Sequence, residues 1–189
     1  LPEGSLMPAT YDYALGEDRS AIVKRMQAAM RQAITDAWDE RDDGLPIASP
    51  EEMVILASIV EKETGLDGER HKVAGVFINR LRIGMKLQSD PTTIYAVTRG
   101  KGPLGRGLRR SELAKKDPYN TYHAAGLPPG PIANPGREAL MAVAQPEATD
   151  ALYFVADGTG GHAFSKTLAE HNRNVKKWRA IEKKRKAAQ

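Results

Sequence analysis

Two acidic side chains lie at the end of an apolar stretch, in the sequence ASIVEKETG at residues 57–65. Glu61 and Glu63 are two positions apart, and residues with this spacing point to different sides of a helix. We therefore expect only one of them to take part in a reaction. The usual chemistry of a single protein carboxyl is proton transfer, for which its pKa must lie near the working pH.

The helix that carries both acids is marked by a capping box. Ser49 is a typical N-cap residue, and Pro50 suits the first position of a helix. Glu52 stands where its carboxylate can bond back to the cap. This pattern predicts a helix that begins at Ser49 and ends at Gly65.

The periodicity of this helix separates the two acids. Glu63 falls inside the apolar stripe, whereas Glu61 lies toward the polar side. Desolvation and the negative end of the helix dipole both raise the pKa of Glu63. The position favours Glu63 as a general acid that is still protonated near neutral pH. In an alternative that stays open, Glu63 bonds a backbone group or pairs with an arginine such as Arg80.

Four segments predict the helices that surround this one. Apolar residues at spacings of three and four predict helices over 18–43 and 67–83. Asn134 and the proline after it predict a helix that runs to about Gln145. A second capping box at 167–170 predicts the start of a basic C-terminal helix.

The remaining segments predict a small sheet and long loops. Residues 85–97 predict a short strand and then a helical turn that Asp90 caps, and 98–118 predict a loop with one short helix after Ser111. Two apolar stretches around a glycine-rich turn predict a β-hairpin at 152–166. The expected fold class is α+β, a mostly helical single domain with a small antiparallel sheet that includes this C-terminal hairpin.

The composition favours one domain that is stabilised by packing. With 189 residues, 41% of them hydrophobic, the chain can bury one sizeable core. The absence of cysteine excludes disulfides and thiolate zinc sites. The four histidines lack the spacing of a zinc site, so we expect no metal, and we expect His162 and His171 to make structural hydrogen bonds.

Positive charge is concentrated at the C-terminus. The net charge is +4, but residues 173–189 hold eight basic side chains and one acid. Such a run is typical of a solvated helix face, or of a surface that binds nucleic acid or another anionic polymer. We expect the solvated face and no nucleic-acid partner.

Four blocks of sequence, in order, resemble one known family. They are ASIVEKETG, VFINRLRIGMKLQSDPTTIYAV, DPYNTYHAAGLPPGPIANPG and YFVADGTGGHAFSKTLAEHN. Together they closely resemble the endolytic murein transglycosylases of the YceG-like family, most strongly from Met53 to Asn172. The resemblance implies a catalytic domain at 1–172, with 173–189 as its basic helical tail. It also implies that Glu63, the second acid of Glu-Lys-Glu, is catalytic.

The resemblance implies a reaction that needs one acid and no cofactor. Such enzymes cut the bond between N-acetylmuramic acid and N-acetylglucosamine inside glycan strands of peptidoglycan. The C6 hydroxyl of the same muramic acid attacks, which leaves a 1,6-anhydro end. Because this nucleophile is tethered, its effective molarity replaces the work of a second carboxylate. Glu63 would protonate the glycosidic oxygen and then accept the hydroxyl proton.

The resemblance also implies a location and partners. Family members are anchored in the bacterial inner membrane and act on its periplasmic face, with peptidoglycan synthases as partners. The chain opens at Leu1 and contains neither the family's membrane anchor nor its LysM-like region. We therefore expect the catalytic domain alone, associated with the membrane only through an anchor outside this sequence.

Sugar-binding side chains are expected around Glu63. Planar polar groups, carboxylates and aromatic faces suit glycans, and the expected cleft residues are Gln88, Asp90, Tyr119, Asn120, Tyr122 and Asn134. As alternatives, Asp90 and Asn134 cap helices and the tyrosines pack in the core. Asn79 and Arg80 are expected either to orient Glu63 or to face solvent.

Two other functions stay open. A second carboxylate at Asp90 would permit hydrolysis by water, as in a muramidase. Alternatively, the protein is a non-catalytic module whose basic tail binds an anionic polymer. Anhydromuramic products would separate the first of these from a transglycosylase.

Overall fold

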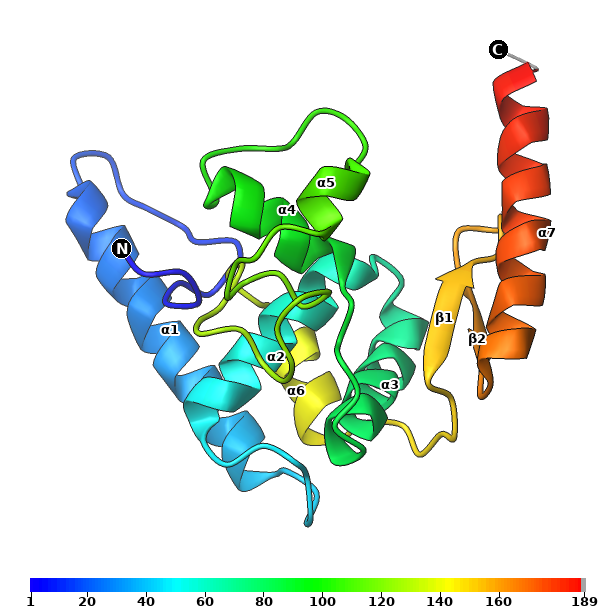
Figure 1. Cartoon of the computed structure of the whole chain (residues 1–189). Helices are drawn as coiled ribbons and strands as arrows, with labels where there is room; N and C mark the ends of the chain where they lie inside the picture. The colour runs from blue at the N-terminus through cyan, green and yellow to red at the C-terminus, as the bar shows by residue number, and fades with distance from the viewer. Residues whose placement is uncertain (188–189) are drawn as a thin grey trace.

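The computed structural model describes the backbone of residues 1–187 and every side chain among them except that of Asp67. The α+β class is confirmed, with a mostly helical body and one antiparallel hairpin (Figure 1). In chain order the elements are α1 (Arg19–Asp39), α2 (Pro50–Glu63), the 3₁₀ turn η1 (Asp67–Glu69), α3 (Arg70–Arg82), α4 (Asp90–Thr98), α5 (Arg110–Leu113), α6 (Arg137–Ala144), β1 (Tyr153–Ala156), β2 (His162–Ser165) and α7 (Leu168–Ala187).

The core is built around α2. Helices α1, α3 and α6 all pack against it, and α6 also packs against α3. The apolar stripe predicted on α2 is fully buried, including Met53, Leu56 and Val60. Burial of such side chains stabilises a fold by about 1.5–3 kcal/mol each. Helix α2 is therefore firmly packed and holds its last residue, Glu63, in a fixed position.

The capping box predicted for α2 forms in part, because Glu52 bonds back to Ala48 rather than to the cap residue Ser49. The hydroxyl of Ser49 accepts from the backbone N–H of Glu52 at 3.3 Å, and the Glu52 carboxylate accepts from the N–H of Ala48 at 2.7 Å. The helix ends earlier than predicted, because Thr64 adopts an extended conformation. Glu63 is therefore the last helical residue.

The strand expected in 85–97 does not form. Gln88 has a left-handed backbone with φ of 48°, which breaks an extended run. The N–H of Gln88 donates to the carbonyl of Thr121 at 3.2 Å, but the N–H of Ser89 donates to the Thr121 side chain at 3.0 Å, so no ladder of backbone bonds follows. Instead of one turn, a full helix α4 follows, with Ser89 rather than Asp90 in the N-cap position.

Helix α6 begins later than predicted. Gly136, not Asn134, is its N-cap residue, and the carboxylate of Glu61 accepts from the N–H of Gly136 at 3.1 Å. A negative charge at a helix N-terminus is favourable. Glu61 thus has a structural partner, where the sequence indicated only a surface position.

The hairpin and α7 form a wall beside the body. Strand β1 pairs antiparallel with β2 around the glycine-rich turn, which confirms the predicted hairpin, and α7 packs on both strands. The capping box at 167–170 forms, with Thr167 and Glu170 bonded at 3.2 Å in both directions. Phe154 of β1 meets Phe77 of α3 edge to face, with ring centroids 5.7 Å apart.

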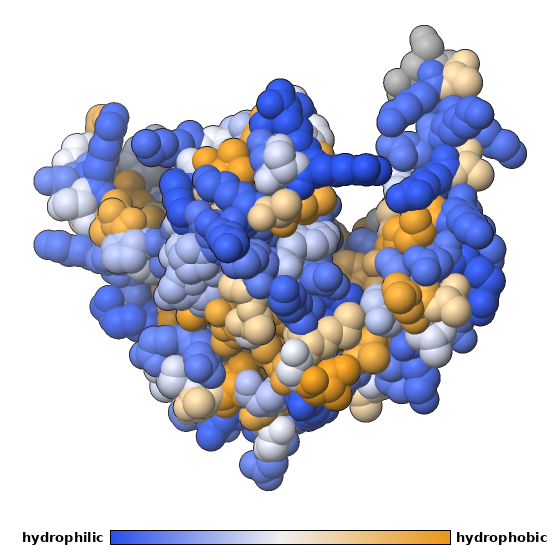
Figure 2. Space-filling model, in the orientation of Figure 1, coloured by the Kyte–Doolittle hydropathy of each residue, from blue (hydrophilic) through white to orange (hydrophobic). Residues whose placement is uncertain are grey.

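The C-terminal half of α7 extends away from the body (Figure 1). Helix α7 has no buried residue among those described, and hydrophilic side chains dominate its outer end (Figure 2). This agrees with a solvated basic face. Within residues 1–187, no helix combines the length and apolar character that crossing a membrane requires.

Candidate active site

A cleft of about 440 Å³ lies between the end of α2 and the wall of β1, β2 and α7. It brings together five of the residues proposed from the sequence: Glu63, Arg80, Gln88, Asp90 and Tyr122. The wall contributes other side chains to the lining, among them Tyr153, Phe154, His162 and His171. The site is therefore assembled from α2, α3, the start of α4, the loop after α5, and the wall.

Glu63 is a half-buried carboxyl at this cleft. Burial raises the pKa of Glu63 to about 7, and the negative charge of Asp90 adds to the rise. The nearby Ser89 hydroxyl and the charges of His162 and Arg80 act in the opposite direction. A carboxyl with this pKa exists in both protonation states near neutral pH, as an acid that later acts as a base must.

Arg80 does not form an ion pair with Glu63 in the described structure. Its buried guanidinium donates from Nε to the carbonyl of Leu152 at 2.7 Å and from Nη1 to that of Leu87 at 2.5 Å. It also lies 5.4 Å from the ring centroid of Tyr153. Arg80 thus joins two sides of the cleft, and Glu63 remains able to exchange its proton.

Asp90 and Tyr122 form a pair at the cleft. The Tyr122 hydroxyl donates to the Asp90 carboxylate at 2.6 Å. Burial and this bond both raise the pKa of Tyr122, so it stays a donor. Asp90 does not cap α4 but is its first residue, and Gln88 lines the cleft from the strained turn before it.

Asn120 and Tyr119 lie outside this cleft. The side chain of Asn120 is fully buried and donates to the carbonyls of Leu113 at 2.9 Å and Lys115 at 2.8 Å. Tyr119 packs against the ring of Tyr95, with centroids 4.8 Å apart. The contacts of both residues organise the loops around α4 and α5.

Asn79 and Asn134 also lie apart from Glu63. Asn79 donates to the carbonyls of Thr149 at 2.7 Å and Ala151 at 3.2 Å, and so fixes the connection that leads into β1. Asn134 accepts from the N–H of Leu6 at 3.1 Å, which ties down the N-terminal segment.

The Glu69–His162 pair was not predicted from the sequence. The carboxylate of Glu69 accepts from the backbone N–H of His162 at 2.9 Å and lies 2.7 Å from its Nδ1. The two residues are separated by 93 positions, and no helix or strand period spans such a gap. The only available signal was a histidine directly after the glycine-rich turn.

His171 was expected to make a structural hydrogen bond, but its Nδ1 is buried with no partner among the described residues. Its ring stacks on Tyr153 with centroids 5.2 Å apart. Burial and the nearby charge of Arg80 lower the pKa of His171. A neutral imidazole therefore faces the cleft from α7.

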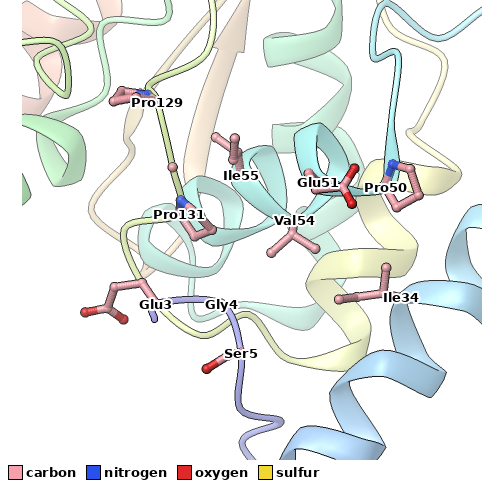
Figure 3. Close-up of a pocket in the computed structure, with 11 residues that line it drawn as sticks. Glu3, Gly4, Ser5, Ile34, Pro50, Glu51, Val54, Ile55, Pro129 and Pro131 are labelled. Atoms are coloured by element: carbon pink, nitrogen blue, oxygen red, sulfur yellow. The ribbon is translucent and has the colours of Figure 1, made fainter. Parts of the chain in front are cut away.

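A separate apolar cavity of about 380 Å³ lies under the N-terminal segment (Figure 3). Figure 3 shows Gly4 beside Val54 of α2 and Pro131 of the proline-rich loop. A Cβ at Gly4 would lie 2.8 Å from Pro131 and 2.9 Å from Val54, and φ is +76°, so only glycine fits. Glu63 does not line this cavity.

Comparison with known proteins finds relatives over most of this chain. A relative from Bacillus subtilis (strain 168), named endolytic murein transglycosylase, is 38% identical over 181 residues, which is 93% of this chain and 48% of the relative. A protein of the same name from Streptococcus pneumoniae serotype 2 (strain D39 / NCTC 7466) is 34% identical over 180 residues, or 92% of this chain and 31% of that protein. The chain therefore spans half or less of the length of these relatives.

A solved structure shares the fold. The crystal structure of a putative yceG-like protein from Listeria monocytogenes superposes with a TM-score of 0.77 at 39% identity, over 90% of this chain and 54% of that one. The model of the YceG-like family matches residues 1–177. This chain is a member of the YceG-like family.

Proposed function

We propose that this protein is an endolytic lytic transglycosylase of peptidoglycan, with Glu63 as general acid and then general base. The observation that carries the proposal is a carboxyl whose burial raises its pKa to about 7, lining an open cleft without an ion pair among the described residues. The names of the relatives support the same reaction class.

In the first step, protonated Glu63 gives its proton to the glycosidic oxygen that links N-acetylmuramic acid to N-acetylglucosamine. The bond from this oxygen to C1 breaks, and positive charge develops at C1. In the second step the C6 hydroxyl oxygen of the same muramic acid bonds to C1, and its proton passes to the Glu63 carboxylate. The glutamic acid is regenerated, and the glycan ends in a 1,6-anhydro ring.

Asp90 is proposed to stabilise the charge at C1. Its carboxylate lines the same cleft and is oriented by the Tyr122 hydroxyl. Preorganised charges of this kind contribute strongly to catalysis. The same placement favours a second candidate function, because Asp90 could instead activate a water molecule for hydrolysis.

Digestion of purified sacculi tests the proposal. The wild-type protein and Glu63→Gln are each incubated with sacculi, and the sugar ends are identified by mass. Anhydromuramic ends are expected from the wild type and not from the variant. Glu61→Gln is the matched control, because Glu61 bonds α6 rather than lining the cleft. Reducing muramic ends would support hydrolysis, and equal release by Glu63→Gln would reject both functions.

We also propose, from the family resemblance alone, that the whole protein acts at the periplasmic face of the inner membrane beside peptidoglycan synthases. The catalytic unit in this proposal is 1–172, with 173–189 as its tail. Residue 173 lies inside α7, so tail and wall share one helix.

A further inference from the structure

We propose that a second cleft binds the glycan strand on the other side of the bond that Glu63 cleaves; this inference rests on the proposed function. The second cleft has a volume of about 530 Å³. The residues that matter to the argument are Lys62, Pro91, Ile94, Tyr95, Thr98 and Asn134, all of which line it.

The second cleft adjoins the first at two points of the chain. Lys62 lines the second cleft and Glu63 lines the first, although they are consecutive residues of α2. In the same way, Pro91 lines the second and Asp90 the first at the start of α4. Because α2 and α4 pack together, these two pairs form a ridge with one cleft on each side, and Glu63 lies at the boundary.

The lining of the second cleft suits an N-acetylated glycan. Ile94, Pro91 and the ring of Tyr95 offer apolar surface for the faces of sugar rings. Asn134 uses its Oδ1 to accept from Leu6, while its amide NH₂ makes no hydrogen bond within residues 1–187. This group is placed to donate to a sugar hydroxyl or an acetamido carbonyl.

Lys62 adds a positive charge at the ridge. Its side chain is exposed, and it forms no ion pair in the described part of the chain. The peptide stems of peptidoglycan carry carboxylates, which an ammonium group attracts. A strand that crosses the ridge would therefore meet Lys62 on one side and Glu63 on the other.

Two clefts on either side of the acid explain cleavage within a strand. A site with room on one side only would accept chain ends, whereas a site open in both directions accepts an internal bond. The second cleft thus gives a physical basis for the endolytic mode in the proposed function.

Binding of glycan fragments tests this inference in the Glu63→Gln background, where no cleavage interferes. The probes are uncrosslinked peptidoglycan glycans of two lengths, a single disaccharide peptide and a longer strand, and affinity is measured by calorimetry. Ile94→Trp fills the second cleft with a bulky ring, and Lys62→Ala removes an exposed cation without touching the core. Leu45→Trp is the matched control, because Leu45 lines an unrelated cavity. Thermal unfolding verifies that each variant is folded.

We expect the long strand to bind at least about tenfold more tightly than the short fragment. Ile94→Trp should remove most of this advantage and Lys62→Ala part of it, while Leu45→Trp leaves the advantage unchanged. If the long strand binds no more tightly than the short fragment, or if its advantage is unchanged in Ile94→Trp and Lys62→Ala, the proposal that the second cleft binds glycan is wrong. The proposed function is judged separately, because the sacculus digestion of wild type against Glu63→Gln does not depend on this result.

Discussion

Glu69 holds His162 at two atoms, with 2.9 Å to its backbone nitrogen and 2.7 Å to Nδ1. Glu69 ends the short turn after α2, and His162 begins β2. One carboxylate therefore connects the segment that follows Glu63 to the opposite wall of the cleft. The imidazole and the ring of Phe154 also meet edge to face, with centroids 5.3 Å apart.

We expect Glu69→Gln to loosen the wall, because hydrogen bonds to charged groups with little exposure stabilise more than surface pairs do. The free energy of unfolding in urea should fall by about 2 kcal/mol, with a larger KM for glycan. Glu182→Gln is the control, because its ion pair with Lys186 is exposed and should contribute less than about 1 kcal/mol. Equal losses in both variants would contradict the expected role of Glu69.

Cleavage should slow as the pH rises through about 7, because the first step requires protonated Glu63. The pH dependence of kcat/KM measures this directly. Asp90→Asn removes a negative charge that raises the pKa of Glu63, so the alkaline limb should move to lower pH. An alkaline limb that stays in place would show that another group controls the rate.

Glu63→Gln should stabilise the folded protein at alkaline pH. The pKa of Glu63 is raised from 4.5 to about 7, so ionisation costs more in the folded state than in the unfolded state. This cost is absent below pH 4.5 and grows until the pH exceeds 7. Urea unfolding at pH 8 should therefore favour Glu63→Gln by about 2–3 kcal/mol, with no gain from ionisation at pH 4. If the difference in unfolding free energy between Glu63→Gln and the wild type were the same at both values of pH, the Glu63 carboxyl would not be desolvated.

Asn120→Ala should destabilise the protein by about 3 kcal/mol, because it leaves buried carbonyls without donors. Besides the loop carbonyls, Asn120 accepts from the hydroxyl of Thr93 at 2.9 Å. Asn174→Ala is the matched control, since Asn174 makes one bond, to Ser165 at 3.0 Å. Thermal unfolding compares them, and a drop no larger than that of the control would contradict the role of Asn120 as a buried anchor of the loops.

Sacculus cleavage should persist when Lys183 and Lys184 are both replaced by glutamine. Both side chains are exposed on α7 and neither lines the cleft. Release of anhydromuramic ends measures the outcome, and pelleting with sacculi at increasing salt measures binding. Salt-sensitive binding that persists in Glu63→Gln, together with no cleavage by the wild type, would favour the polymer-binding module.

The sequence predicted those features that depend on residues close together in the chain, such as helix caps, helix faces and tight turns. The capping box at Ser49 and the apolar stripe placed Glu63 at the interior side of the last turn of α2, and the hairpin followed from its glycine-rich turn. The position of Asn120 could not be predicted in this way. An amide, a polar loop and two tyrosines describe a sugar site and a buried loop anchor equally well, and only the fold decides between them.

Long-range pairing explains the other differences. The start of 85–97 was predicted as a strand, but it makes only one backbone bond to the Thr121 segment, from Gln88 N–H to the Thr121 carbonyl at 3.2 Å. The next N–H, of Ser89, donates to the Thr121 hydroxyl, so no ladder continues. Likewise, Glu61 reaches Gly136 across 75 positions. Neither contact produces a periodic pattern in the sequence from which it could be predicted.

The wall of β1, β2 and α7 follows the body in the chain and joins it through the connection from Gln145 to Leu152, which Asn79 and Arg80 hold by its carbonyls. Because Asn79 and Arg80 bind backbone carbonyls, their hold does not depend on which side chains the connection carries. Lengthening or shortening this connection would move the wall, which forms one side of the cleft, while the helices around α2 kept their packing. The width of the cleft beside Glu63 therefore depends on the length of one connection that lies outside the helical core.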